Sequence, residues 1–94
     1  MDFKVLKYFI AVAEELNFTR AAEKLHISQP PLSTQIQNLE SDLGTKLFIR
    51  SNHGLQLTDS GKLLLDRAKQ IIAIGEHTKE DIKNLEEDLK SKKS

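Results

Sequence analysis

The chain has 94 residues, enough for one small domain, and its 14 basic residues equal its 14 acidic ones. It contains no cysteine, which excludes a disulfide framework and a thiolate metal site. The zero net charge counts against a nucleic-acid-binding protein unless the basic side chains gather on one side. No apolar run approaches membrane-spanning length and no signal peptide precedes the first expected helix, so we expect a soluble, cytoplasmic protein.

Two helices are expected at the start of the chain. The first is predicted over residues 2–15, where apolar side chains recur at helical spacing: Val5, Leu6, Phe9, Ile10 and Ala13. The second is predicted to begin after Thr19, whose hydroxyl would cap it, and to end near Leu25. A tight polar turn over His26–Ser28 separates it from the next helix.

A third helix is predicted over residues 29–43, with Ser28 as its N-cap. Pro30 and Pro31 fall in its first turn, where proline costs little because the backbone N–H groups there lack helical partners. Gly44 provides the left-handed residue that ends it. Its buried face is expected to carry Leu32, Ile36, Leu39 and Leu43. The pair of helices therefore predicts a helix-turn-helix whose second helix is shaped to enter the major groove of duplex DNA.

A β-hairpin is predicted next. Residues 47–50 and 55–57 would form its strands, and the turn at 51–54 ends in Gly54, which is free to adopt a positive φ. This hairpin, residues 47–57, would be the wing of a winged helix-turn-helix and would lie at the adjacent minor groove or the DNA backbone. The alternative is a surface hairpin that makes no DNA contact.

The last predicted element is a long helix over residues 58–89, capped by Thr58 with Asp59 at its positive end, followed by a polar tail at 90–94. Steps of four and three residues connect a seam of apolar and small side chains: Leu64, Ala68, Ile71, Gly75, Thr78, Ile82, Leu85 and Leu89. Such a seam predicts pairing with a second helix. Packing onto the chain's own domain is the alternative, but it would leave the last three members in water.

Together these elements predict a mainly α fold: a winged helix-turn-helix with a three-helix core and a two-stranded wing over residues 1–57, then a long linker or dimerisation helix. The block S-Q-P-P-L-S-x-Q-I-x-x-L-E-x-x-L-G at 28–44 resembles the DNA-binding domain of LysR-type transcriptional regulators. The flanks match as well, with L-x-x-F/Y-x-x-V-A-E at 6–14, N-F-T-R-A-A at 17–22, L-F-x-R at 47–50 and L-T-x-x-G at 57–61. The resemblance covers about residues 1–75.

The resemblance implies sequence-specific binding of double-stranded DNA by a homodimer whose linker helices pair antiparallel. Such regulators are usually longer and carry a second domain for a small molecule. No effector-binding domain is present in this sequence, so we expect a DNA-binding fragment of a longer regulator. The full-length regulator could form an oligomer larger than a dimer. A natural short protein is the alternative. No cofactor, metal, small-molecule ligand or membrane contact is expected for this part.

The uncharged face of the recognition helix is expected to contact bases through Gln29, Pro30, Pro31, Ser33, Thr34 and Gln37. Thr19, Arg20, Arg50 and the backbone amides at the starts of the second and third helices are expected to hold phosphates. Arginine near a helix start opposes the helix dipole, which hints that an anion lies close to Arg20. The nearby acids are expected on helix ends or facing away from DNA: Glu14, Glu15, Glu40 and Asp42.

Two departures from the LysR-type pattern bear on which bases are read. Position 34 is often arginine in these regulators and is Thr34 here, and the wing tip, which often carries arginine, has Asn52 and His53. A guanidinium reads guanine edges and narrow A·T minor grooves well. We therefore expect an A·T-rich inverted repeat with few guanine-specific contacts.

Two other classes of function compete with DNA binding. An enzyme is not expected, because His26, His53 and His77 form no His-x-x-x-His pair, the glycines are isolated and no nucleophile motif is present. The second alternative is a winged-helix and coiled-coil module that docks a protein, or a short dominant-negative form, without strong DNA binding. The uncharged third helix and zero net charge are the features that favour it.

Overall fold

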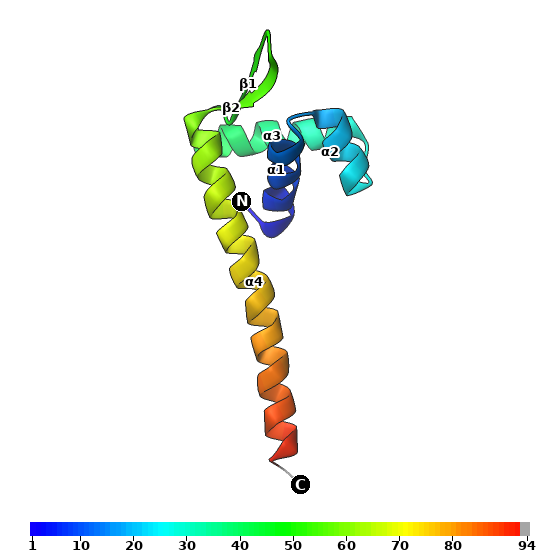
Figure 1. Cartoon of the computed structure of the whole chain (residues 1–94), viewed down its shortest axis with the longest axis vertical. Helices are drawn as coiled ribbons and strands as arrows, with labels where there is room; N and C mark the ends of the chain where they lie inside the picture. The colour runs from blue at the N-terminus through cyan, green and yellow to red at the C-terminus, as the bar shows by residue number, and fades with distance from the viewer. Residues whose placement is uncertain (93–94) are drawn as a thin grey trace.

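The computed structural model describes residues 1–92. Its elements, in chain order, are α1 (Phe3–Glu15), α2 (Phe18–Leu25), α3 (Gln29–Leu43), β1 (Phe48–Ser51), β2 (Gly54–Leu57) and α4 (Asp59–Ser91). Figure 1 shows α1, α2 and α3 packed into a head from which the β1–β2 wing projects, while α4 leaves the head as a long arm. The molecule measures 65 × 26 × 21 Å. The predicted mainly α winged helix-turn-helix with a long final helix is thereby confirmed.

Caps set where the first two helices begin. Asp2 caps α1, which ends at Leu16 in the left-handed conformation with a φ of 50°. The prediction that Thr19 caps α2 is wrong, because Asn17 occupies that position with extended backbone and its Oδ1 accepts a 2.9 Å hydrogen bond from the Arg20 amide. An asparagine two residues earlier competes for the same orphan amides, so Thr19 lies inside the first turn.

Helix α3 begins and ends where the sequence predicts, but the Ser28 side chain does not cap it. Ser28 is at the N-cap position yet makes no side-chain capping hydrogen bond. A cap side chain accepts from the second or third amide of the helix, and here those positions are Pro30 and Pro31, which have no N–H. At the other end Gly44 has a φ of 70°, as expected. Leu43 departs from the predicted buried face and is 43% exposed.

The wing is an antiparallel hairpin with the register Phe48↔Leu57 to Ser51↔Gly54. Its turn is two residues long, Asn52 and His53, so it is tighter than the predicted four-residue turn. Gly54 follows with a φ of 92°, which is the positive value expected for this position.

Helix α4 begins as predicted and extends further. The Thr58 hydroxyl oxygen accepts a 3.0 Å hydrogen bond from the Gly61 amide and so caps the helix. The helix continues to Ser91, so residues 90 and 91, predicted as a polar tail, are helical. Lys90 lies in the last turn, where a cation suits the negative end of the helix dipole. Positions 93–94 of the predicted tail lie outside the described residues.

The core lies where α1, α3 and the segment before the wing meet. Three aromatic rings tie the wing to it: the Phe9 and Phe48 ring centroids are 5.4 Å apart, and those of Phe18 and Phe48 are 6.0 Å apart. The largest fully buried side chains around them are Phe9, Val12, Leu32, Ile36, Leu39 and Leu47. The recognition helix and the base of the wing are therefore built on one shared core.

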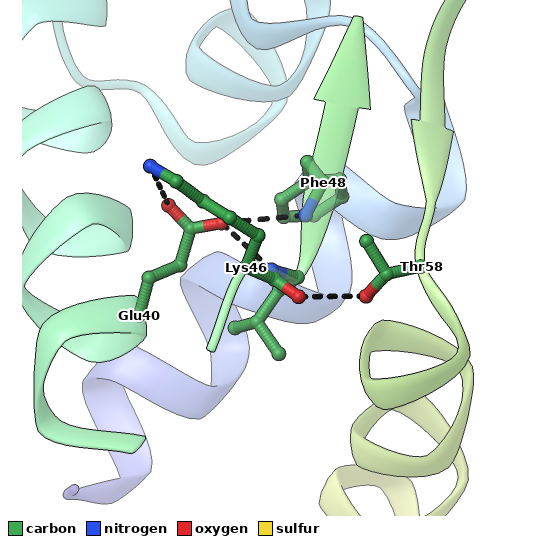
Figure 2. A network of polar contacts seen from close by, with 5 residues as sticks. Glu40, Lys46, Phe48 and Thr58 are labelled. Carbon is green, nitrogen blue, oxygen red and sulfur yellow. Dashed lines mark hydrogen bonds and ion pairs between the residues drawn. The ribbon is translucent and has the colours of Figure 1, made fainter. Parts of the chain in front are cut away.

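A polar clamp fixes the segment that joins α3 to the wing (Figure 2). Glu40 Oε2 accepts hydrogen bonds from the amides of Leu47 at 2.7 Å and Phe48 at 3.3 Å, and Glu40 Oε1 lies 3.9 Å from Lys46 Nζ. From the other side, the Thr58 hydroxyl donates a 2.7 Å hydrogen bond to the Lys46 carbonyl. Residues 46–48 are thus held between α3 and the start of α4.

Gly61 allows α4 to approach this segment closely. A Cβ at position 61 would overlap the carbonyl oxygen of Leu47 and the side chain of Leu57. The Leu47 carbonyl already accepts a 3.0 Å hydrogen bond from the Thr58 amide, so it is not free to move away.

We expect Gly61→Ala to lower the free energy of unfolding in urea by about 1–3 kcal/mol through overpacking. An alanine for glycine within a helix normally raises stability by up to about 1 kcal/mol, so the sign of the change is diagnostic. Lys62→Ala, at the next and exposed position, is the matched control. A Gly61→Ala protein as stable as that control would contradict the close approach.

Candidate nucleic-acid interface

The outer face of α3 carries a row of uncharged side chains. Of the six predicted base-contacting residues, five are exposed and Ser33 is half-buried, while Leu32, Ile36 and Leu39 on the opposite face are buried. Gln29, Ser33 and Gln37 follow one another at steps of four, and Pro30 and Thr34 run beside them, with Pro31 also exposed in the first turn. The predicted residues therefore lie together on one accessible face of α3.

Two hydrogen bonds within α3 organise this row. Gln29 Nε2 donates a 2.8 Å hydrogen bond to Ser33 Oγ, and the Thr34 hydroxyl donates to the carbonyl of Pro30 at 3.1 Å. The Gln29 amide keeps its second N–H and its oxygen, which is the donor and acceptor pair that matches an adenine edge. Thr34 has committed its proton to the backbone, so it offers a lone pair and a methyl group.

Arg50 on β1 stands beside the row. It lines one cleft with Thr19 and Gln29, and a second cleft with Ser33 and Gln37. Its guanidinium lies 5.8 Å from the centroid of the Phe18 ring, a cation–π contact that positions the side chain. Within residues 1–92 it forms no ion pair. The wing thus places one unpaired cation next to the uncharged face of α3.

The wing tip lies apart from this cluster. Asn52 and His53 are exposed at the turn, which projects from the head in Figure 1. The His53 amide donates a 3.1 Å hydrogen bond to Ser51 Oγ, and that hydroxyl reaches the Gly54 carbonyl at 3.4 Å. The tip is therefore shaped by its own bonds, and its two polar side chains are free to meet another molecule.

Thr19 and Arg20 lie exposed in the first turn of α2, but Arg20 already has an anion beside it. Arg20 Nε lies 4.0 Å from Glu15 Oε1, and Lys24 Nζ lies 3.9 Å from Glu15 Oε2. The carboxylate of Glu15 therefore offsets the unfavourable interaction between Arg20 and the positive end of the α2 dipole. Glu15 does stand at the end of α1, as expected, but it faces the cations of α2.

The backbone amides expected to hold phosphates are fewer at the start of α3 than at the start of α2. At α2 the Arg20 amide is taken by Asn17, which leaves the first two amides of the helix for an outside anion. At α3 the second and third positions are Pro30 and Pro31, so those amides do not exist. Among the first three residues of α3 only Gln29 keeps an N–H, so the start of α3 offers a phosphate fewer amides than expected.

Only part of the predicted seam along α4 packs against the head, and the rest is exposed. Ala68 is fully buried by the head, and Gly75 lies against the ring of Phe3, which a Cβ at this position would overlap. Leu64 and Ile71 are half-buried. Gly75, in the middle of the seam, therefore accommodates Phe3 of α1 in the same chain, whereas the seam pattern predicted a partner helix there.

The apolar side chains that α4 leaves exposed form a second stripe, the arm stripe: Leu63, Ile74, Ile82, Leu85 and Leu89, each 46–66% exposed. Thr78 is exposed on the same stretch. Sequence reasoning missed Leu63 and Ile74, because periodicity finds apolar faces without saying which neighbour covers them. At its N-terminal end, near Leu63, the stripe continues into an apolar cleft lined by Leu43, Leu47 and Leu64.

The histidines stand on separate elements. His26 ends α2 with a φ of 59°, His53 is at the wing tip and His77 is exposed on α4. In the described range 1–92, no three His, Cys, Asp or Glu side chains are arranged to hold a metal ion. Over these residues no helix combines the length and apolar character of a membrane span.

Fold and surface together define a winged helix-turn-helix protein with an uncharged recognition face and a long helical arm. Residues 3–62 match the family described as bacterial regulatory helix-turn-helix protein, lysR family. The chain belongs to this LysR family.

Relatives and solved structures agree with the assignment. The chain is 54% identical over 74 residues to the HTH-type transcriptional regulator TfdT of Cupriavidus pinatubonensis, covering 79% of this chain and 32% of TfdT. It is 52% identical over 71 residues to the regulator XapR of Escherichia coli, covering 76% of this chain and 24% of XapR. The chain thus spans 24–32% of the length of these relatives.

Solved structures match over about nine tenths of this chain. The CbnR DBD–DNA complex has a TM-score of 0.85 at 44% identity, covering 89% of this chain and 97% of that one. The complex of the BenM DBD with benA site 1 DNA has a TM-score of 0.86 at 40% identity, covering 90% and 96%. The fold is that of LysR DNA-binding domains.

Proposed function

We propose that the chain binds double-stranded DNA sequence-specifically as a homodimer and is the DNA-binding part of a LysR-type transcriptional regulator. Residues 1–57 read the DNA, with α3 in the major groove and the wing at the adjacent minor groove or backbone. Residues 58–89 pair the two copies. The observation that carries this is the uncharged, exposed row on α3 with unpaired Arg50 beside it, on a chain whose relatives are regulators and whose structural neighbours hold DNA.

The side chains at this interface divide into those that contact bases, called readers, and those that bind phosphates, called anchors. Gln29 pairs with adenine, while the Thr34 methyl and the Pro30 ring pack against thymine methyl groups. Ser33 and Gln37, which line the cleft beside Arg50, contact bases or phosphates deeper along the helix. Thr19, the free amides of α2 and Arg50 bind phosphates and so fix the register of the head on the duplex.

The dimer rests on the arm stripe. Five large apolar side chains are exposed along about 40 Å of helix, and each is worth about 1.5–3 kcal/mol when buried. A second copy of α4, antiparallel to the first, covers them and lets the far end of each arm reach the apolar cleft beside the partner's head. Two-fold symmetry then places two copies of α3 in successive major grooves, so the site is an inverted repeat.

Selection of bound duplexes from a random library tests the proposal. We expect an A·T-rich inverted repeat with half-sites about one helical turn apart, because the reading face holds amide, hydroxyl and apolar groups and no guanidinium. A G·C-rich consensus would contradict the base assignment, and recovery of no consensus would contradict the function.

Two variants separate reading from anchoring in the same selection. Gln29→Ala is expected to relax the preference at one base pair of each half-site by about 1–3 kcal/mol. Arg50→Ala is expected to weaken binding to all duplexes alike and to flatten the salt dependence of binding. If both variants changed the consensus in the same way, the division between reader and anchor would be wrong.

The location and the wider role follow from this ligand. A bacterial regulator of this kind works in the cytoplasm on chromosomal DNA, and it has no catalytic step. Zero net charge and the ion-paired cations of α2 favour the second candidate, a module that docks a protein. That candidate gains support only if folded protein fails to retain any duplex at low salt.

A further inference from the structure

The cations at the reading side of the head differ in whether an acid holds them. Arg50 forms no ion pair within residues 1–92. Arg20 and Lys24, on α2, share the carboxylate of Glu15, at 4.0 Å and 3.9 Å. Their side chains are 64% and 59% exposed, whereas that of Glu15 is 31% exposed and sits between them. The two cations of the helix that leads into α3 therefore share a single carboxylate, which offsets half of their positive charge.

We propose that Glu15 limits the affinity of the head for the phosphate backbone by competing for Arg20 and Lys24. This inference rests on the proposed function. A guanidinium or ammonium that moves to a phosphate must leave the carboxylate or share it, and a phosphate that approaches Arg20 also approaches the charge of Glu15. Both effects reduce the electrostatic gain of every DNA contact in this corner, whatever the base sequence.

The corner between α1 and α2 has other means of holding its shape. Leu16 makes the turn in the left-handed conformation, Asn17 caps α2, and Ala21 and Ala22 are buried against the core. Ion pairs between exposed side chains add little to stability, typically between zero and about 1 kcal/mol. Glu15 is therefore not needed to keep α1 and α2 in place, which leaves its charge as its main effect on the surface.

Glu14 supplies a matched control. It is the preceding residue, carries the same charge, and also forms an ion pair, with Lys69 Nζ at 3.2 Å. Its partner is on α4, away from the row on α3 and from the start of α2. Glu14→Gln and Glu15→Gln make the same change in net charge and side-chain size, so a difference between them reports on position alone.

The experiment measures the dissociation constant of each dimer for a short duplex of random sequence at several salt concentrations. We expect Glu15→Gln to bind about three- to ten-fold more tightly than wild type at low salt. The slope of log affinity against log salt should steepen by up to about 0.9 for each additional phosphate that the released cations neutralise. Glu14→Gln should change affinity by less than about two-fold.

A double-variant cycle assigns the tighter binding to the named cations. In an Arg20→Ala/Lys24→Ala background, Glu15→Gln should no longer raise affinity. An increase that persists there, or equal effects of Glu14→Gln and Glu15→Gln, would overturn the inference while leaving DNA binding intact. Loss of folding in Glu15→Gln alone would also overturn it, because Glu15 would then be structural. If neither wild type nor any variant bound duplex, the proposed function would fail, and this inference with it.

Discussion

Replacing Ile82 and Leu85 together by aspartate is expected to convert the proposed dimer to a monomer. Both side chains are more than half exposed on the arm stripe. The C-terminal part of α4 extends beyond the head in Figure 1. Burial of each against a partner contributes about 1.5–3 kcal/mol, and each substitution occurs twice in a dimer. The dimer dissociation constant should therefore rise at least about a thousand-fold. Sedimentation equilibrium of wild type and variant measures this directly.

The matched control places the same two charges on the other side of the arm. Ala73 and Asn84 are exposed on α4 and, at about 100° per residue, lie roughly 130–150° around the helix from the midpoint between Ile82 and Leu85. Ala73→Asp with Asn84→Asp should leave the dimer mass unchanged. A variant of the stripe that still sediments as a dimer, or a control that dissociates as readily, would show that the two copies meet elsewhere.

Loss of the dimer also predicts the behaviour on DNA. A monomer engages one half-site, and the second contact no longer benefits from the effective concentration that the arm provides. The Ile82→Asp/Leu85→Asp protein should therefore bind an inverted repeat no better than an isolated half-site. Because the head keeps its own core of α1, α3 and the wing base, its binding to the half-site should remain close to that of wild type.

Local rules of backbone chemistry were sufficient to predict α3. Two prolines near its start and a glycine at its end determine its limits, and the row of uncharged side chains follows from helical spacing alone. The same rules misplaced the α2 cap, because Asn17 and Thr19 are both good caps and the sequence does not rank them. They also overlooked that Pro30 and Pro31 remove the very amides that Ser28 would cap and a phosphate would bind.

Periodicity was less informative along α4. An apolar position is equally apolar whether α1 of the same chain or a second copy covers it. Phe3 fills the space at Gly75, and the head buries Ala68, so this part of the seam turned inward while Leu63 and Ile74 were left outside. Which face meets which neighbour depends on how the head docks on the arm, and that is a property of the folded chain.

Acidic residues were the most difficult to interpret from sequence. Glu15 and Glu40 were expected at helix ends or on sides away from DNA, with no partner assigned. In the structure Glu15 holds two cations of α2, and Glu40 holds two backbone amides of the wing base. A carboxylate can bind a cation, a backbone amide or water. Which of these it binds depends on the groups that the folded chain places beside it.

Glu40→Ala is expected to loosen the wing from the recognition helix. The amides of Leu47 and Phe48 would lose their acceptor while both residues remain buried. An unsatisfied buried amide costs about 1–3 kcal/mol, so the free energy of unfolding in urea should fall by about 2–4 kcal/mol. Glu40→Gln keeps an acceptor oxygen and should lose less than half as much, and Asp42→Ala, an exposed acid two residues further along α3, should lose almost nothing.

Amide hydrogen exchange shows where the loss occurs. In Glu40→Ala, the amides of Leu47 and Phe48 should exchange faster than those of Phe9 and Val12 in α1, because the clamp at 46–48 opens before the core does. DNA affinity should fall as well, since Arg50 depends on the wing base for its position beside α3. Uniform acceleration of exchange across the head would mean that Glu40 supports the whole fold. Unchanged exchange at Leu47 and Phe48 would mean that its carboxylate holds neither amide in solution.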